Sequence, residues 1–197
     1  MKEITKAEMD IVLKLVKSPE VEYNANNISK VAGITAMGAL KILKRLESES
    51  ILKSKKIGNA HIYRINVENS YAQRHVGLLL SRESLYASPQ AKRWVEELKK
   101  IRNAELIILF GSVLEKINPK DIDVLFLTDQ KHFSQLEKEI KERNEINIKK
   151  IHPLYQTFKD IINNVKKRDQ PLLNAIKGII IKGEEKFIEV YYESRKE

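Results

Sequence analysis

The chain of 197 residues contains no cysteine, which excludes disulfide bonds and metal sites built on thiolates. No apolar run approaches the roughly 18 residues that a membrane-spanning helix needs. The first residues, MKEITKAEMD, lack the apolar stretch of a signal peptide. We therefore expect a cytoplasmic protein with no membrane partner. Walker, dinucleotide-binding, Gly-x-Ser-x-Gly and zinc-protease motifs are also missing, and the four histidines show no ligand spacing.

Positive charge is in excess. The chain has 36 Lys+Arg against 27 Asp+Glu, a formal net charge of +9. The first 67 residues alone hold 12 Lys+Arg and 7 Asp+Glu. A basic balance of this kind favours a polyanionic partner. With 42% hydrophobic residues, the chain is long enough for two small domains rather than one large one.

The first 67 residues predict three helices followed by a hairpin. Apolar residues at helical spacing predict helices over 6–17, from about 24 to 32, and over 35–48, with Thr5, Asn24 or Asn26, and Thr35 as N-caps. Strands are expected at 52–56 and 61–65 around a Gly-Asn turn. This order resembles a winged helix-turn-helix domain, which implies binding to double-stranded DNA.

In such a domain the third helix enters the major groove, and the hairpin contacts backbone or minor groove. The resemblance implies that the start of the third helix faces base edges: Thr35, Ala36 and Met37. Cations on the helix and the hairpin are expected to contact phosphates: Lys41, Lys44, Arg45, Lys53, Lys55 and Lys56. The alternative is that these cations are the solvated face of a small domain used for dimerisation.

The most informative pattern is LFGSVLEKINPKDIDVLFL. An apolar run, 106–110, ends at Gly111, and a second run, 121–127, begins with two carboxylates. Because strand side chains alternate, Asp121 and Asp123 share one face. Two acids beside apolar neighbours repel each other, and a divalent cation is the candidate that compensates them. Gly111 permits close approach of a ligand, and Ser112 would open a short helix that favours phosphate. The alternative is a solvated strand end.

The Gly111-Ser112 turn followed by Asp121 and Asp123 resembles the nucleotidyltransferase superfamily that includes DNA polymerase beta and the minimal nucleotidyltransferases. The resemblance covers roughly residues 100 to 190. It implies an α/β (α+β) domain with a small mixed sheet flanked by helices. It further implies that an NTP binds with its phosphates on the Gly-Ser turn. It also implies that the two acids hold magnesium or manganese.

This chain lacks the arginine that minimal members of the family carry after the Gly-Ser turn. Minimal members usually carry Ala-Arg-Gly shortly after Gly-Ser, and here the stretch reads Leu-Glu-Lys. Lys116 or Lys120 could neutralise a triphosphate as a point charge, but neither offers the planar fork of a guanidinium.

The family's third carboxylate lies on a later strand, and it is also altered. A helix over 133–143 and a strand over 145–151 place Asn147 at that position, with Glu145 two residues away on the same strand face. Asn147 can ligate a metal but cannot act as a general base. The alternative is that Glu145 and Asn147 are ordinary exposed residues of a degenerate site.

These patterns predict a winged helix-turn-helix domain over 1–67, a helical linker over 68–100 and a nucleotidyltransferase-like domain over 101–197. We expect magnesium-dependent transfer of a nucleoside monophosphate from NTP to an acceptor that the sequence does not identify. The alternative is a transcriptional regulator whose degenerate domain senses nucleotide or mediates homodimerisation, or an antitoxin paired with a small helical protein. The altered arginine and third acid favour the alternative, whereas the intact Gly-Ser and Asp-Ile-Asp favour retained metal or nucleotide binding.

Overall fold

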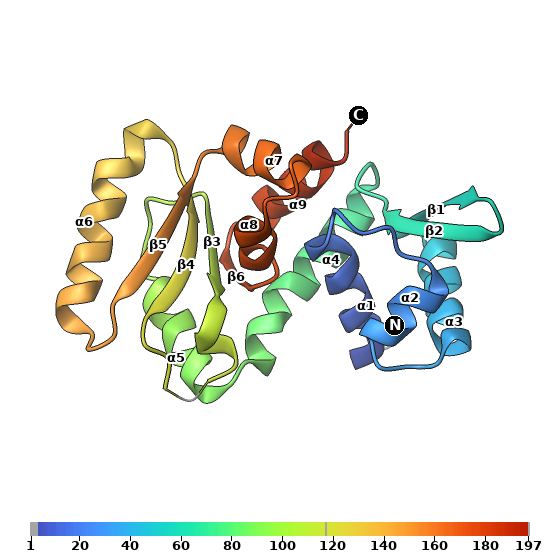
Figure 1. Cartoon of the computed structure of the whole chain (residues 1–197), viewed down its shortest axis with the longest axis horizontal. Coiled ribbons are helices and arrows are strands. Elements are labelled where there is room, and N and C mark those ends of the chain that lie inside the picture. Colours follow the sequence, from blue (N-terminus) through green and yellow to red (C-terminus); the bar gives the residue numbers. More distant parts are fainter. Residues whose placement is uncertain (1–3, 117, 197) are drawn as a thin grey trace. The chain divides into compact units, whose positions relative to one another are not determined.

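Residues 4–116 and 118–196 are described by a computed structural model, in which helices flank two small sheets (Figure 1). The predicted mixed α+β class is confirmed. The chain divides into two units, Met1–Leu79 and Leu80–Glu197. The domain boundaries expected near residues 67 and 100 stay a prediction. Among the described residues, no helix combines the length and apolar character that crossing a membrane requires.

Capping side chains fix the starts of the first three helices. Thr5 caps α1 (Lys6–Lys17), Asn24 caps α2 (Ala25–Val31) and Thr35 caps α3 (Ala36–Ser48), each by accepting a hydrogen bond from a backbone amide of the first turn. The apolar side chains at helical spacing are buried in the core of this unit: Ile11, Val12, Leu15, Ile28, Leu43 and Leu46. The helix order predicted for this region is therefore confirmed.

A two-stranded hairpin follows the helices. β1 (Leu52–Ile57) and β2 (Ala60–Ile65) pair antiparallel with Ile57 opposite Ala60. Gly58, with φ of +58°, lies in the two-residue turn between them, where a side chain would be strained. α4 (Ser70–Glu83) comes next in the chain. Three helices and a hairpin in this order are the arrangement expected of a winged helix-turn-helix.

The second unit is built on a four-stranded mixed sheet in the order β5-β4-β3-β6. β4 and β5 are parallel, whereas β3 is antiparallel to both of its neighbours, β4 and β6. The elements are, in chain order, η1 (Ser84–Tyr86), α5 (Pro89–Leu98), β3 (Leu106–Phe110), η2 (Gly111–Leu114), β4 (Ile122–Leu127), α6 (Gln130–Ile146), β5 (Ile151–Gln156), α7 (Phe158–Lys166), α8 (Gln170–Ala175), β6 (Ile179–Lys182) and α9 (Glu184–Ser194).

Alternation along β4 decides which side chains face the core. Ile122, Val124 and Phe126 pack with residues of α5 and α6 in one buried cluster that also contains Trp94. Asp123 lies between them in sequence and therefore points to the other face of the sheet. α7, α8 and α9 pack against β5 and β3 (Figure 1). The sheet thus directs Asp123 away from the α5–α6 core.

The strand predicted over 145–151 is wrong. α6 continues to Ile146, and β5 begins only at Ile151. The apolar-polar-apolar pattern Ile-Asn-Ile imitates a strand, but the Ile146 and Ile148 side chains are 69% and 90% exposed rather than on a buried face. Asn147 instead ends the helix, because its backbone and side-chain amides both donate to the carbonyl oxygen of Arg143.

Candidate nucleotide site and candidate nucleic-acid interface

The turn at Gly111 is built against the carboxylate of Asp123. Phe110, the last residue of β3, pairs with Asp123 across the sheet, so the turn that follows lies beside this side chain. Gly111 has φ of +76°, and a Cβ atom there would lie 2.3 Å from Asp123 Oδ2. Both the backbone conformation and the space therefore require glycine. The expected close approach at Gly111 is made here by the carboxylate itself.

A cleft of about 620 Å³ opens beside this turn. Its walls come from the end of β3, η2, the first residues of β4 and β5, and the α8 region: Phe110, Gly111, Leu114, Glu115, Asp123, His152, Pro153, Leu154, Pro171, Asn174, Lys177 and Gly178. Gly178 also packs closely, because a Cβ atom there would lie 2.3 Å from the carbonyl oxygen of Leu109. A volume of this order suits a small-molecule ligand of nucleotide size.

His152 stands next to Asp123, which the sequence did not predict. The parallel pairing of β4 with β5 puts the two residues opposite each other, and His152 Nδ1 lies 3.2 Å from Asp123 Oδ1. The side chain of His152 is 77% exposed and that of Asp123 is 29% exposed. The available signal was the stretch IHPLY, which begins at Ile151 after two lysines and would have placed His152 near the start of the strand after α6.

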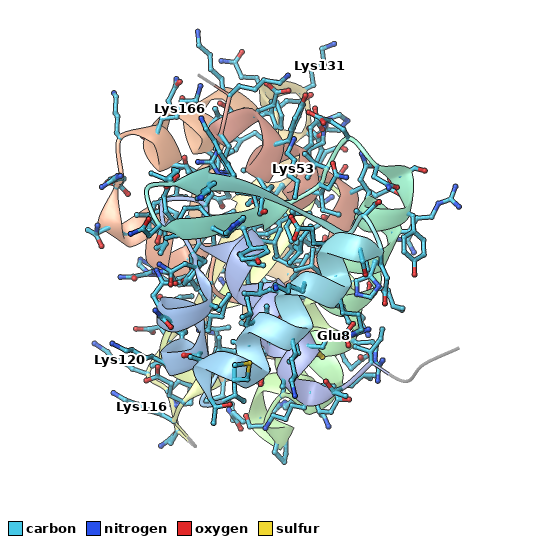
Figure 2. All side chains as sticks on the ribbon, turned by 90° about the vertical axis from the view of Figure 1, so that its right-hand side faces the viewer. Glu8, Lys53, Lys116, Lys120, Lys131 and Lys166 are labelled. Atoms are coloured by element: carbon cyan, nitrogen blue, oxygen red, sulfur yellow. The ribbon has the colours of Figure 1, made fainter. Side chains whose placement is uncertain are left out.

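The remaining residues expected around the phosphates lie on the β3–β4 connection. Ser112 is in η2, a single 3-10 turn rather than the short helix expected. Asp121 is exposed and immediately precedes β4. Figure 2 shows Lys116 and Lys120 extending outward from this connection, and both are exposed. Neither of these lysines lines the cleft. The connection therefore brings carboxylates and cations to one edge of the sheet.

Glu145 and Asn147 do not accompany the acids on a strand. Glu145 is an exposed residue in the last turn of α6. Asn147 is buried, and its side-chain amide reaches Arg143 and, at 3.5 Å, Glu97 Oε2 on α5. Glu97 in turn pairs with Lys100, which is the main reason that the pKa of Glu97 is lowered. Asn147 thus joins α6 to α5 and does not line the cleft.

The carboxylates at this edge are of the chemical type that binds a hard divalent cation, and the expected metal site stays a prediction. Carboxylate oxygens are the usual protein ligands of magnesium, which keeps waters and phosphate oxygens in its other positions. Within the part of the chain that the structure describes, no three His, Asp or Glu side chains gather closely enough to enclose an ion.

The first unit presents one face of α3 to solvent. Thr35, Ala36, Met37, Lys41 and Lys44 are exposed, and Met37 is a large apolar residue that is 63% exposed. The Thr35 hydroxyl is used to cap α3, since it accepts from the Gly38 amide at 3.0 Å. Among the described residues, neither Lys41 nor Lys44 forms an ion pair. This face therefore keeps uncompensated positive charge.

The hairpin lies beside that face. Lys44 of α3 and His61 of β2 line the same cleft, together with Asn26 at the start of α2. Lys53, Lys55 and Lys56 are exposed on β1, and Figure 2 shows Lys53 on the hairpin ribbon. Lys53 pairs with Glu68 at 3.2 Å. Lys55 and Lys56 have no acidic partner among the described residues, so the hairpin carries two further unpaired cations.

Arg45 is half-buried and is already paired with two carboxylates. Its guanidinium pairs with Glu8, whose side chain is only 2% exposed, and with Glu49 at 3.2 Å. Burial works against the charge of Arg45, but hydrogen bonds and charge attraction from these two carboxylates leave its pKa raised. Glu8, on α1, is buried and is compensated by this cation. The expected contact of Arg45 with phosphate stays a prediction.

The comparisons with known proteins give limited information. No protein-family model matches the sequence, and no curated protein matches it. Among solved structures, the chain is similar to Sso10a-2, a DNA-binding protein from Sulfolobus solfataricus, with 27% sequence identity over 46% of this chain and 93% of that chain. The TM-score is 0.31, too low to establish a common fold. The functional interpretation therefore rests on the geometry of the two units.

Proposed function

We propose that the first unit binds double-stranded DNA. The observation that supports this proposal is the solvent face of α3, where Lys41 and Lys44 lie unpaired beside the lysine-bearing hairpin. A helix of this kind fits the major groove, and lysines on adjacent elements neutralise phosphates on either side of it. Met37 and Ala36, at the exposed start of the helix, are placed to contact base edges.

The test is duplex binding by the full chain. Lys41→Ala with Lys44→Ala should weaken binding to any duplex, because each lost phosphate contact removes part of the counterion-release term. A control that removes the same charge is Lys131→Ala with Lys138→Ala, two exposed lysines on α6. Equal loss of affinity in both double variants would show that net charge alone, and not the α3 face, binds the duplex.

We propose that the second unit is a nucleotidyltransferase centre that acts on an NTP. The supporting observation is the carboxylate of Asp123 packed on the glycine turn at the mouth of a nucleotide-sized cleft. Asp121 and Asp123 would hold magnesium or manganese, and Gly111 and Ser112 would position the triphosphate. Lys116 and Lys120 would balance its charge from the β3–β4 connection.

The reaction is a displacement at phosphorus. An oxygen of the acceptor forms a bond to the α-phosphorus, the bond to the bridging oxygen breaks, and pyrophosphate leaves. A metal ion held by Asp121 and Asp123 would neutralise charge on the phosphates. The residues of the cleft would bind the NTP and orient its phosphates, and positioning of this kind accounts for much of the catalysis in phosphoryl transfer.

Transfer is measured with each α-labelled NTP and magnesium or manganese, with and without nucleic acid or a co-purifying protein. Asp123→Asn should abolish label transfer, since it removes a charge from a site with few charges. The matched control is Asp129→Asn, which changes an exposed aspartate at the opposite end of β4. Transfer that persists in Asp123→Asn and falls in Asp129→Asn would place the chemistry elsewhere.

One observation favours a second function, in which the unit senses nucleotide for a DNA-binding regulator. The residue opposite Asp123 on β5 is a histidine and not a carboxylate, so the site carries less negative charge than a three-acid site. A sensor would show no transfer in the assay above, while NTP with metal would still raise the melting temperature of the protein. Absence of both effects would contradict both functions.

A further inference from the structure

We propose that the second unit carries its own contact site for duplex DNA, the basic turn between α7 and α8, in which Lys166, Lys167 and Arg168 bind backbone phosphates. These three residues do not line the cleft beside Asp123. The choice of duplex DNA as the ligand rests on the DNA binding proposed for the first unit. The experiment below separates the failure of this site from the failure of that function.

The basic turn gathers exposed positive charge that has no acidic partner. Residues 158–170 contain four Lys and Arg against two Asp. All three cations of the basic turn are exposed, and within the part of the chain that the structure describes none of them forms an ion pair. The two aspartates are used locally, because Asp160 accepts from the Thr157 hydroxyl at 2.6 Å and Asp169 accepts from the Leu172 amide at 3.0 Å. The turn therefore keeps charge that a polyanion can neutralise.

The end of α7 does not need these side chains. The backbone amides of residues 167–169 donate to the carbonyl oxygens of residues 163–165 at 2.9 to 3.0 Å. In this pattern the helix ends with a left-handed residue that is usually glycine. Here that residue is Arg168, with φ of 57°. An arginine at this position carries backbone strain that glycine would avoid, which points to a role of its side chain outside the fold.

The exposed face of α7 extends the site along the helix. Lys159, Asn163 and Lys166 recur at i, i+4 and i+7 and are exposed, while Ile161 and Val165 are buried on the other face. Lys166 is seen in Figure 2. Seven residues of helix make this row of donors about 10 Å long. A row of that length suits the successive phosphates of a nucleic-acid strand rather than one isolated phosphate group.

The test is duplex binding by the full chain over a series of salt concentrations. The triple variant Lys166→Ala, Lys167→Ala, Arg168→Gly should weaken binding and reduce the slope of log affinity against log salt by about 2 to 3, close to one unit per phosphate contact. Arg168→Gly alone should reduce the slope by about 1 and should not lower the melting temperature, because glycine suits the left-handed backbone. A residue that served only the fold would give the opposite pair of results.

A matched control removes three exposed lysines from α6, where glutamates are interspersed with them: Lys131→Ala, Lys138→Ala and Lys141→Ala. This variant should keep most of the affinity and of the salt slope. An unchanged slope in the triple variant of the basic turn, or an equal loss in the α6 variant, overturns the proposal. A lower melting temperature of Arg168→Gly with unaltered DNA binding also overturns it.

The variant Lys41→Ala with Lys44→Ala separates the two DNA proposals. If it loses duplex binding while the basic-turn variant does not, the second site is wrong and DNA binding by the first unit stands. If only the basic-turn variant loses binding, the second site is supported and the function proposed for the first unit is contradicted. A wild-type chain that binds no duplex contradicts both.

Discussion

Individual residues in both units are held in positions that a sequence pattern does not reveal. Glu8 is a carboxylate in the helical core of the first unit, where Arg45 and, at 3.8 Å, His75 approach it. His75 Nε2 is buried and has no hydrogen-bond partner among the described residues. The spacing of the histidines gave no sign of this, because a side chain on α4 that approaches Glu8 on α1 cannot be recognised from spacing alone. Such a group links stability to pH.

We expect the stability of the first unit to fall in mild acid because of His75. Burial lowers the pKa of His75 below its ordinary value of 6.5, although Glu8 and Glu49 oppose this and Arg45 adds to it. Between the lowered pKa of the folded state and the ordinary pKa of the unfolded state, the unfolded chain binds the proton more readily than the folded one, so protonation favours unfolding. The stability that neutral His75 preserves is therefore fully present above the ordinary pKa. It is lost as the pH falls toward the lowered pKa.

The measurement is the unfolding free energy in urea between about pH 7.5 and about pH 5.5, where one proton changes stability by at most about 1.4 kcal/mol per pH unit. His75→Gln should flatten this dependence relative to the wild type. An equally steep loss in both proteins would assign the acid sensitivity to other groups.

Gly111→Ala should destabilise the second unit and disturb the candidate site together. A left-handed conformation and a Cβ atom 2.3 Å from Asp123 Oδ2 both oppose the substitution, and we expect a cost of about 2 kcal/mol or more in unfolding free energy. Gly58→Ala is the control, since its φ of +58° carries similar strain but nothing lies within 4 Å of the added Cβ. Equal costs would mean that the contact with Asp123 contributes nothing.

At the scale of the elements, local patterns predicted helix starts and the glycine turn but not long-range pairing. Thr5 and Thr35 were predictable caps because capping depends on neighbouring residues. Likewise, the turn at Gly111 was predictable because the strand-turn-strand pattern is local, whereas the roles of Asp121 and Asp123 at a site stay predictions. The place of His152 opposite Asp123 was not predictable, because it depends on the β4–β5 register across an intervening helix. Arg45 looked like a surface cation because its partner Glu8 is 37 positions away in the sequence.

The hairpin should contribute to DNA binding through Lys55 and Lys56. Both are exposed and unpaired among the described residues, whereas Lys53 is paired with Glu68. We expect Lys55→Ala with Lys56→Ala to reduce the slope of log affinity against log salt by about 2, close to one unit per phosphate contact. Lys53→Ala should change it less. Duplex binding measured over a series of salt concentrations checks this, and an unaltered slope in the double variant would mean that the hairpin does not contact phosphate.

At the scale of the whole molecule, one chain carries two candidate sites: a basic helix-and-hairpin face and a cleft beside Asp123. Each lies within a single unit, Met1–Leu79 or Leu80–Glu197, and each is specified by its own residues. The positive net charge of +9 is consistent with binding to nucleic acid. The cleft beside Asp123 is the part that a simple DNA-binding domain would lack, and the central proposal concerns it.

That claim is tested most directly by calorimetric titration of NTP, with manganese or magnesium present, into the wild type and into Asp121→Asn with Asp123→Asn. We predict saturable binding to the wild type that requires the metal, and loss of that binding in the double variant, because the two carboxylates hold the ion that bridges to the phosphates. Circular dichroism verifies that the variant is folded. Metal-dependent NTP binding of equal affinity in the folded double variant would contradict the account.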